Sequence, residues 1–267
     1  MQSVGEISRP AAPGTFTEII LNKVPQVTLA FWTIKILSTT VGETGADYLA
    51  VNAGLGKALT GGVMAALLLV ALFLQVKAKQ YIPWIYWITV VLLSVVGTQI
   101  TDALTDGLGV SLKISTIVFS VLLALVFAIW YRSERTLSIH AITTRRRELF
   151  YWAAILFTFA LGTASGDLAT EALGLGFRLG AMIFAGMIAA IYIAYRLGLN
   201  AVLAFWMAYI LTRPLGAALG DFLSQAAQYG GLGWGTIGTS VVFLAVIAVL
   251  VAVVTLQQRR ANSAPAA

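Results

Sequence analysis

The sequence contains no cysteine and a single histidine. The lack of cysteine excludes disulfide bonds and thiolate metal sites, and one histidine cannot supply the paired imidazoles typical of zinc centres. Charged residues make up only 10% of the chain, whereas a soluble domain carries about 25%. The sequence also lacks a P-loop and the short segments of alternating polarity that are typical of membrane β-barrels. These absences argue against a soluble globular protein, a soft-metal carrier and a self-sufficient ATP-driven pump.

Long apolar runs take the place of the missing charges, because 59% of the residues are hydrophobic and the mean hydropathy is +0.89. A membrane-spanning helix needs about 20 apolar residues. The sequence predicts eight such spans, at 27–50, 58–76, 82–105, 114–131, 149–170, 177–195, 199–224 and 234–256. We therefore predict an all-α integral membrane protein with eight transmembrane helices, whose lipid partner is the bilayer.

The basic residues indicate how this chain is oriented. Twelve of the 17 Lys and Arg residues fall in the tails and loops on one side of the predicted bundle, three on the other, and two within spans. By the positive-inside rule both termini are predicted to be cytoplasmic. The basic loop at 132–148 is explained as a topology signal, so we predict no nucleic-acid partner.

A pattern of aromatic, glycine and aspartate residues occurs four times. The first copy reads FWTIKILSTTVGETGAD, and it aligns without a gap with YWITVVLLSVVGTQITD, YWAAILFTFALGTASGD and FWMAYILTRPLGAALGD. Each copy starts with an aromatic–Trp pair, has a glycine five residues before its end, and ends in aspartate. The tryptophans are Trp32, Trp87, Trp152 and Trp206, and the aspartates are Asp47, Asp102, Asp167 and Asp221. The glycines begin small-xxx-small motifs, which let helix backbones approach closely.

The repeated pattern resembles a family of uncharacterised bacterial membrane proteins that are built from four tandem two-helix repeats of unknown function, each with a characteristic Trp. The resemblance implies an architecture and a bacterial inner-membrane location, but no activity. The four copies are parallel, so a pseudo-fourfold ring and a two-plus-two arrangement are both open. The predicted division is a tail at 1–22, repeats at 23–79, 80–131, 149–196 and 197–257, the basic loop at 132–148 and a tail at 258–267.

The four aspartates are candidate ligands, because a carboxylate inside a bilayer is costly unless it faces water, a partner or an ion. Alternatively, each aspartate caps a neighbouring helix or loop at the outer boundary. Acidic companions four residues away share a helix face with three of them. The candidate cation- and proton-binding residues are therefore Asp47, Asp102, Asp167, Asp221, Glu43, Asp106 and Glu171, with the four aspartates as the metal ligands. Nearby hydroxyls are weaker candidates, namely Thr39, Thr40, Ser94, Thr98 and Thr163.

Two basic residues lie within predicted spans. Arg213, beside Pro214 in the fourth copy, is predicted to form a structural or gating ion pair with an acid of another repeat; anion binding and snorkelling are the alternatives. Lys35 lies three residues after Trp32, and we expect it to snorkel to the cytoplasmic interface or to pair with a carboxylate.

Oxygen ligands without thiolate or imidazole suit hard cations. The leading hypothesis is a transporter or exporter of a hard cation, preferably a divalent metal such as Mn²⁺, with possible proton coupling on the carboxylates. The alternatives are a passive cation channel, and a membrane scaffold or intramembrane acid/base enzyme. We expect no enzyme activity. A bound divalent cation is the one candidate cofactor, and the sequence leaves the oligomeric state open.

Overall fold

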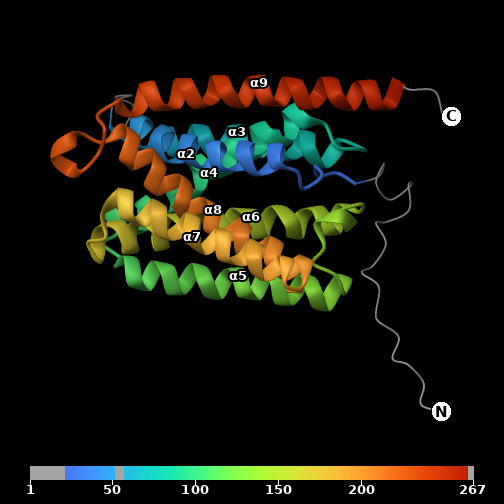
Figure 1. Ribbon diagram of the computed structural model, residues 1–267, viewed down its shortest axis with the longest axis horizontal. Helices are drawn as coiled ribbons and strands as arrows, with labels where there is room; N and C mark the ends of the chain where they lie inside the picture. The colour runs from blue at the N-terminus through green and yellow to red at the C-terminus, as the bar shows by residue number, and fades with distance from the viewer. Residues whose placement is uncertain (1–21, 52–56, 264–267) are drawn as a thin grey trace, which may run out of the picture.

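The computed structural model describes residues 22–51 and 57–263, and these ranges hold eight long helices. The helices are α2 (Leu29–Val51), α3 (Lys57–Lys77), α4 (Pro83–Asp102), α5 (Leu112–Glu134), α6 (Arg145–Asp167), α7 (Gly176–Arg196), α8 (Ala201–Ser224) and α9 (Gly235–Ser263) (Figure 1). In the described part of the chain, seven of them are long and apolar enough to cross a membrane. The other, α2, is the helix that carries Lys35, Glu43 and Asp47. The predicted all-α membrane bundle is confirmed.

The first helices of the four repeats form a closed inner ring. Helix α2 packs on α4, α4 on α6, α6 on α8, and α8 on α2. Between 61% and 67% of the span residues are buried in α4, α6 and α8, against 17% to 22% in α3, α5, α7 and α9. The latter are therefore an outer layer.

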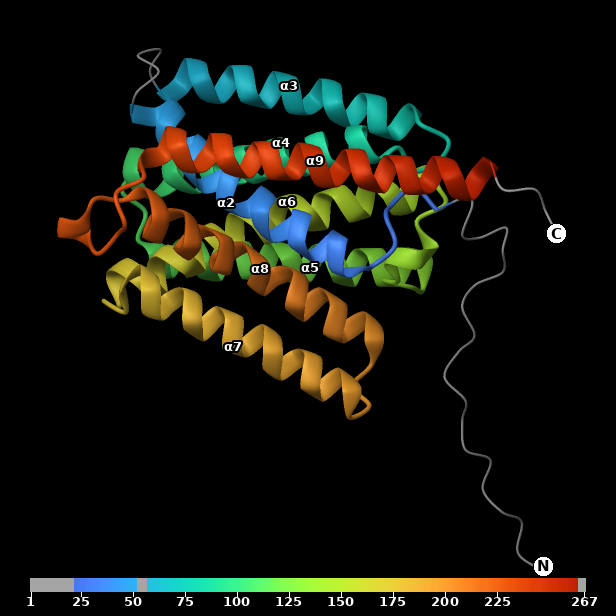
Figure 2. The same ribbon diagram turned by 45° about the horizontal axis from the view of Figure 1, so that its top comes forward.

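Each outer helix covers the ring helix of the next repeat. Helix α3 packs on α4, α5 on α6, α7 on α8, and α9 returns to α2. Helices α5 and α9 lie on opposite sides of the bundle in Figure 1, and α3 and α7 do so in Figure 2. Of the two arrangements that the sequence leaves open, the contacts match the pseudo-fourfold ring.

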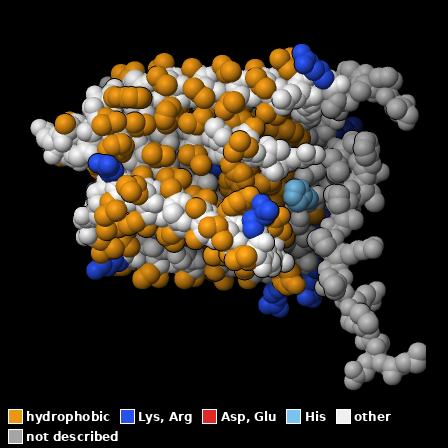
Figure 3. Space-filling model, in the orientation of Figure 1, with side chains coloured by type: hydrophobic (Ala, Val, Ile, Leu, Met, Phe, Trp, Pro, Cys, Tyr) orange, Lys and Arg blue, Asp and Glu red, His pale blue; other side chains and the backbone are white. Residues whose placement is uncertain are grey.

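The outward faces of the outer helices are apolar. Large hydrophobic side chains stand exposed on all four, among them Leu69, Ile117, Met182 and Val249. Figure 3 shows hydrophobic side chains over most of the visible face, with Lys and Arg mostly toward its two ends. Apolar contiguous surface of this extent indicates contact with lipid rather than with water.

Aromatic side chains fill the ring at the end where its tryptophans lie. We call this end the Trp end, and the opposite end, where the aspartates lie, the Asp end. The first aromatic of each repeat contacts the tryptophan of the next. The ring-centroid distances are 5.7 Å for Phe31–Trp87, 5.4 Å for Tyr86–Trp152, 6.2 Å for Tyr151–Trp206 and 5.6 Å for Phe205–Trp32. These eight residues are the aromatic tier. The tryptophans therefore act in packing between repeats.

The glycine five residues before each aspartate lies where two ring helices approach most closely. A Cβ atom added to Gly42 would meet the Ser94 side chain of the next repeat. The same relation recurs around the ring, with Gly97 against Phe159, Gly162 against Arg213, and Gly216 against Thr39. The close helix approach predicted from the small-xxx-small motifs is confirmed.

Helix α8 begins with a side-chain cap that positions its later residues. The Asn200 Oδ1 atom accepts hydrogen bonds from the backbone N–H groups of Val202 and Leu203, at 3.0 and 3.2 Å. Asn200→Ala removes this acceptor, so we expect the free energy of unfolding to fall by about 1 kcal/mol. Denaturant unfolding followed by tryptophan fluorescence measures the change. Asn200→Asp, which keeps the acceptor, is the control; an equal loss in both variants contradicts a capping role.

Candidate functional site

The ring helices present their inner residues in levels that are four residues apart. Residues at this spacing share a helix face, and successive levels lie about 6 Å apart along the axis. Four residues before the aspartates stand Glu43, Thr98, Thr163 and Ala217. Eight residues before them stand Thr39, Ser94, Phe159 and Arg213. Because only the fourth repeat has a long basic side chain at the second of these levels, it breaks the ring's symmetry there.

Arg213 joins all four repeats in the interior of the ring. Its side chain is fully buried, and its Nη2 atom lies 2.7 Å from Glu43 Oε2 of the first repeat. The same nitrogen donates to Thr98 Oγ1 of the second repeat and to Thr163 Oγ1 of the third, the latter at 2.8 Å. Nη1 donates to the Thr39 carbonyl at 3.3 Å. We call Arg213, Glu43, Thr98 and Thr163 the arginine hub.

The surroundings of this hub match the needs of a buried ion pair. Removing two charges from water costs several kcal/mol for each ion, and Coulomb attraction repays it only when further hydrogen bonds complete the geometry. Thr98 and Thr163 donate their own hydroxyl protons to the backbone carbonyls of Ser94 and Phe159. Their hydroxyl oxygens therefore accept hydrogen bonds from the guanidinium. A lysine ammonium is a compact point charge and would not make the same set of hydrogen bonds.

The candidate carboxylates continue from the hub toward the Asp end. Asp102 and Asp167 are the last residues of α4 and α6, and each is followed by a π-helical turn, Ala103–Gly107 and Leu168–Ala172. Such turns often occur at functional sites. Asp221 is buried within α8. The side chain of Asp47 lies outside the described part of the structure.

The charges of these acids act on one another. Asp167 interacts electrostatically with Glu43, Asp102 and Glu171, and also with Arg213. Glu171 in turn interacts with Glu43 and Asp106. Asp106 and Glu171 are exposed at the Asp end, whereas Glu43 is buried. The described acids of the first three repeats, which leave out Asp47, thus form one electrostatically linked group that extends from the Asp end to the hub.

A preformed metal site would bring at least three ligand side chains together. Among the described residues, which leave out the Asp47 side chain, no three His, Cys, Asp or Glu residues are arranged to hold a metal ion. Asp102, Asp167 and Asp221 therefore do not converge on one point in this structure. Glu43, one level further into the ring than the aspartates, has Arg213 as its cationic partner.

The comparisons with known proteins agree with this fourfold organisation. Residues 30–81, 85–136, 150–197 and 204–260 each match the family described as Repeat of Unknown Function (DUF347). The chain belongs to the DUF347 repeat family. Each DUF347 match holds one ring helix and the outer helix that follows it. No curated protein and no solved structure matches the chain.

Lys35, in the first DUF347 repeat, does not reach the interface as we expected. Its side chain is fully buried, with Nζ 4.2 Å from the centroid of the Phe159 ring and 4.4 Å from that of Tyr209. The alternative, pairing with a carboxylate, is not seen either, because Nζ has no hydrogen-bond partner among the described residues. The aromatic tier, which includes Trp32, lies between Lys35 and the Trp end, so a snorkelling side chain has no route to water.

Sequence reasoning missed a buried ion pair near the Trp end, between two residues that precede the first and third DUF347 matches. Lys23 Nζ lies 2.6 Å from Glu148 Oε2, and Gln75 Nε2 donates to Glu148 Oε1 at 3.3 Å. All three side chains are buried. The sequence analysis treats Lys23 only as one of the basic residues that indicate orientation, and it assigns no role to Glu148. An acid directly before a predicted span was the one sequence feature that indicated this cluster.

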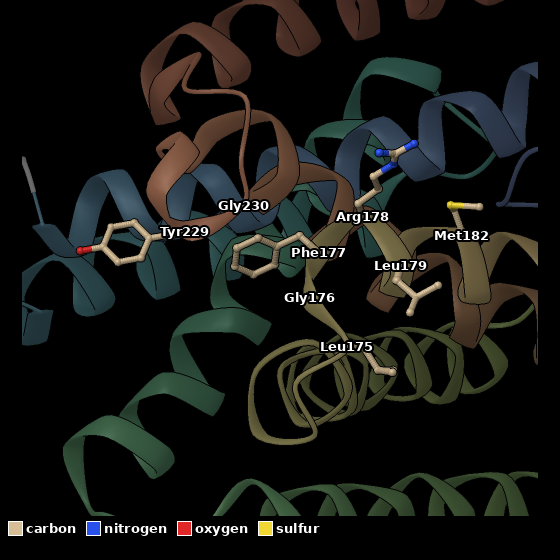
Figure 4. Close-up of a pocket in the computed structure, with 8 residues that line it drawn as sticks. All are labelled: Leu175, Gly176, Phe177, Arg178, Leu179, Met182, Tyr229 and Gly230. Carbon is tan, nitrogen blue, oxygen red and sulfur yellow. The ribbon is translucent and has the colours of Figure 1, made fainter.

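A hollow at the Asp end is distinct from the hub. It has a volume of about 400 Å³ and lies between the start of α7 and the turn Ala227–Tyr229. Figure 4 shows Phe177 and Tyr229 pointing to the same side, while Arg178 points away from them. None of the residues that line it is acidic. The hollow therefore offers no carboxylate ligand, and the candidate site is the hub with its neighbouring acids.

Proposed function

We propose that this DUF347 protein transports a small hard cation across the membrane, and that the cation approaches through the acids at the Asp end. The observation that supports this most is the electrostatic group around Asp167, which leads from exposed Glu171 to buried Glu43. Ionisable residues inside membrane bundles characteristically mark ion pathways and proton relays. The basic residues favour a cytoplasmic Trp end, because Lys and Arg are enriched on the cytoplasmic side.

The ring interior supports a carrier over a passive channel. Arg213 occupies the ring beneath the acids, and the aromatic tier occupies it at the Trp end. A cation or proton that binds Glu43 competes with Arg213 for the same carboxylate oxygens. Occupancy of the acids would thus weaken the arginine hub, which holds all four repeats together, and so couple binding to a rearrangement of the ring.

The ligand chemistry supports a hard cation. The available groups are carboxylate and hydroxyl oxygens, which bind Mg²⁺, Ca²⁺, Mn²⁺, Na⁺ or H⁺ in preference to soft metals. We take Mn²⁺ as the first ion to test. Because the carboxylates lie close enough to interact, exchange of protons for metal is the proposed form of energy coupling.

Uptake of Mn²⁺ into proteoliposomes tests the transport proposal. We expect Asp102→Asn, Asp167→Asn and Asp221→Asn each to lower the initial uptake rate by about tenfold or more, since each loses a charged ligand and tenfold corresponds to about 1.4 kcal/mol. Glu134→Gln is the matched control, because Glu134 is the last residue of α5 and pairs with Arg147 at the start of α6, at the end of the bundle opposite the Asp end. Imposing and collapsing a proton gradient in the same vesicles tests the coupling.

Wild-type uptake rates in all three Asn variants contradict the proposal and favour a scaffold. Unitary currents that do not respond to the proton gradient favour the channel. Size-exclusion profiles and tryptophan fluorescence identify any variant whose lower rate follows from misfolding.

A further inference from the structure

The outer layer of the bundle has a groove between α3 and α9. Helix α3 packs chiefly on α4, and α9 packs chiefly on α2, so the two outer helices have little contact with each other (Figure 2). The space between them is a hollow of about 340 Å³, whose lining includes Gly45 of α2, Met64 of α3, Val95 of α4 and Val241 of α9. We call it the α3–α9 groove. It reaches from the lipid-facing surface to two helices of the inner ring.

The α3–α9 groove depends on a glycine that occurs in the first repeat alone. At the positions equivalent to Gly45, two residues before each aspartate, stand Ile100, Ser165 and Leu219. A Cβ atom added to Gly45 would meet only Val95 Cγ2, at 3.8 Å. The space beside this glycine is therefore open, and the groove is a departure from the fourfold repetition.

The α3–α9 groove offers little to water or to an ion. None of its lining residues is charged, and only Tyr48 and Ser240 among them have polar side chains. Thr44 Oγ1 donates its proton to the Thr40 carbonyl and lies 2.7 Å from Ser240 Oγ, so the Ser240 hydroxyl donates to Thr44. A water molecule needs two to four polar partners, which such a site does not provide. An empty groove, however, would lose the dispersion contacts that its lining residues make in a filled one.

The size and position of the α3–α9 groove indicate what fills it. A helix with its side chains is about 10 Å across, so a single turn takes up roughly 400 Å³, more than the 340 Å³ of the groove. An extended peptide would bring unsatisfied backbone groups into the bilayer. The groove is continuous with the lipid-facing surface, because Val241 and Leu244 in its lining are 59% and 43% exposed. A single hydrocarbon chain is both narrow enough and apolar enough to enter.

We propose that one acyl chain of a membrane phospholipid binds in the α3–α9 groove, with the phospholipid headgroup toward the Asp end. Tyr48, a half-buried lining residue, lies three residues before the end of α2 on that side, and tyrosine rings are enriched at the headgroup level. Lipid chains are as apolar as leucine side chains, so affinity comes from packing rather than from transfer out of water. A chain in the groove packs against four helices, whereas lipid on the outward faces meets one or two. This inference does not rest on the transport proposal, since it applies equally to a protein that moves no cation.

Photo-labelling in lipid vesicles tests the proposal. The protein is reconstituted into phosphatidylcholine vesicles that contain a small fraction of phosphatidylcholine with a diazirine in one acyl chain. After illumination, peptide mass spectrometry identifies the labelled residues. We expect Val95 and Val241 in the groove to be labelled severalfold more than Leu69 and Ile117, which are exposed on the outer helices α3 and α5.

Gly45→Leu fills the groove with the side chain that Leu219 has at the equivalent position of the fourth repeat. We expect this variant to lose the excess labelling while its gel-filtration profile stays unchanged. Gly186→Leu is the matched control on α7, where an added Cβ atom meets nothing within 4 Å, and it should keep the excess. The proposal is overturned if Val95 is not labelled in the wild type, or if Gly45→Leu is labelled as the wild type is.

A second copy of the chain is the competing occupant, and a cysteine substitution detects it. Because the chain has no cysteine, Val241→Cys introduces a single thiol at an exposed position of the groove. We expect this variant to remain monomeric on mild oxidation in the same vesicles. Efficient formation of an intermolecular disulfide would place another protein chain at the groove and would also overturn the proposal.

Discussion

Replacing Arg213 with Met lowers the free energy of unfolding by about 3–5 kcal/mol, because it leaves the Glu43 carboxylate buried without its cationic partner. The side chain of Arg213 is fully buried and its hydrogen bonds reach the first three repeats. Its loss therefore also removes the hydrogen bonds that it donates to the hydroxyl oxygens of Thr98 and Thr163. Unfolding in mixed detergent micelles, with tryptophan fluorescence as the signal, measures the change. We expect the reporter to be sensitive, since the aromatic tier separates when the ring opens.

A double-mutant cycle identifies the ion pair as the cause of this loss. Glu43→Gln removes the negative charge but keeps a hydrogen-bonding side chain, and in the Arg213→Met background it should recover part of the lost stability. A coupling energy of about 1–3 kcal/mol is expected for residues in direct contact within one network. Strict additivity of the two substitutions would show that Arg213 acts through packing alone. Arg178→Met is a suitable control, because Arg178 lies at the Asp end outside the hub.

Repetition made the ring predictable. Four gapless copies with one glycine and one aspartate each imply that the same contact recurs around the bundle, because repeated supersecondary units bury their faces against one another. The sequence therefore predicted close approach at Gly42 and its equivalents, and an acid of another repeat as the partner of Arg213. It did not predict Ser94 or Glu43 as the specific partners, because spacing along one helix does not define which helix comes next in a ring.

The deviations from symmetry were the hardest part to predict. Lys35 was expected near an interface because it follows Trp32 closely, and tryptophans often mark the headgroup level. In the structure the tryptophans pack between repeats, and Trp87, Trp152 and Trp206 are buried. The level of Lys35 is thus inside the protein. When a residue occurs in only one repeat, its surroundings are formed by the other three repeats. The pattern within its own helix therefore does not predict which side chains it contacts.

The second large effect is expected at Gly42, where the first two repeats touch. A Cβ atom there would lie 3.0 Å from the Ser94 backbone carbonyl carbon as well as meeting the Ser94 side chain. Backbone cannot yield as a flexible side chain does, so Gly42→Val must push α2 and α4 apart. Inserting such volume into a packed contact costs about 1–3 kcal/mol, and we expect about 3 kcal/mol here. The same micelle unfolding experiment provides the value.

Gly45 supplies the matched control on the same helix, because a Cβ there would meet only Val95 Cγ2, at an ordinary 3.8 Å. Gly45→Val changes helix propensity as Gly42→Val does, so the difference between the two variants reports the interhelix contact. Ser94→Gly should restore part of the stability of Gly42→Val, since it removes the side chain that the new atoms meet. Equal losses in Gly42→Val and Gly45→Val, with no recovery from Ser94→Gly, would mean that α2 and α4 do not approach at this level. The arginine hub depends on that approach, since Glu43 reaches Arg213 only if α2 stays in the ring.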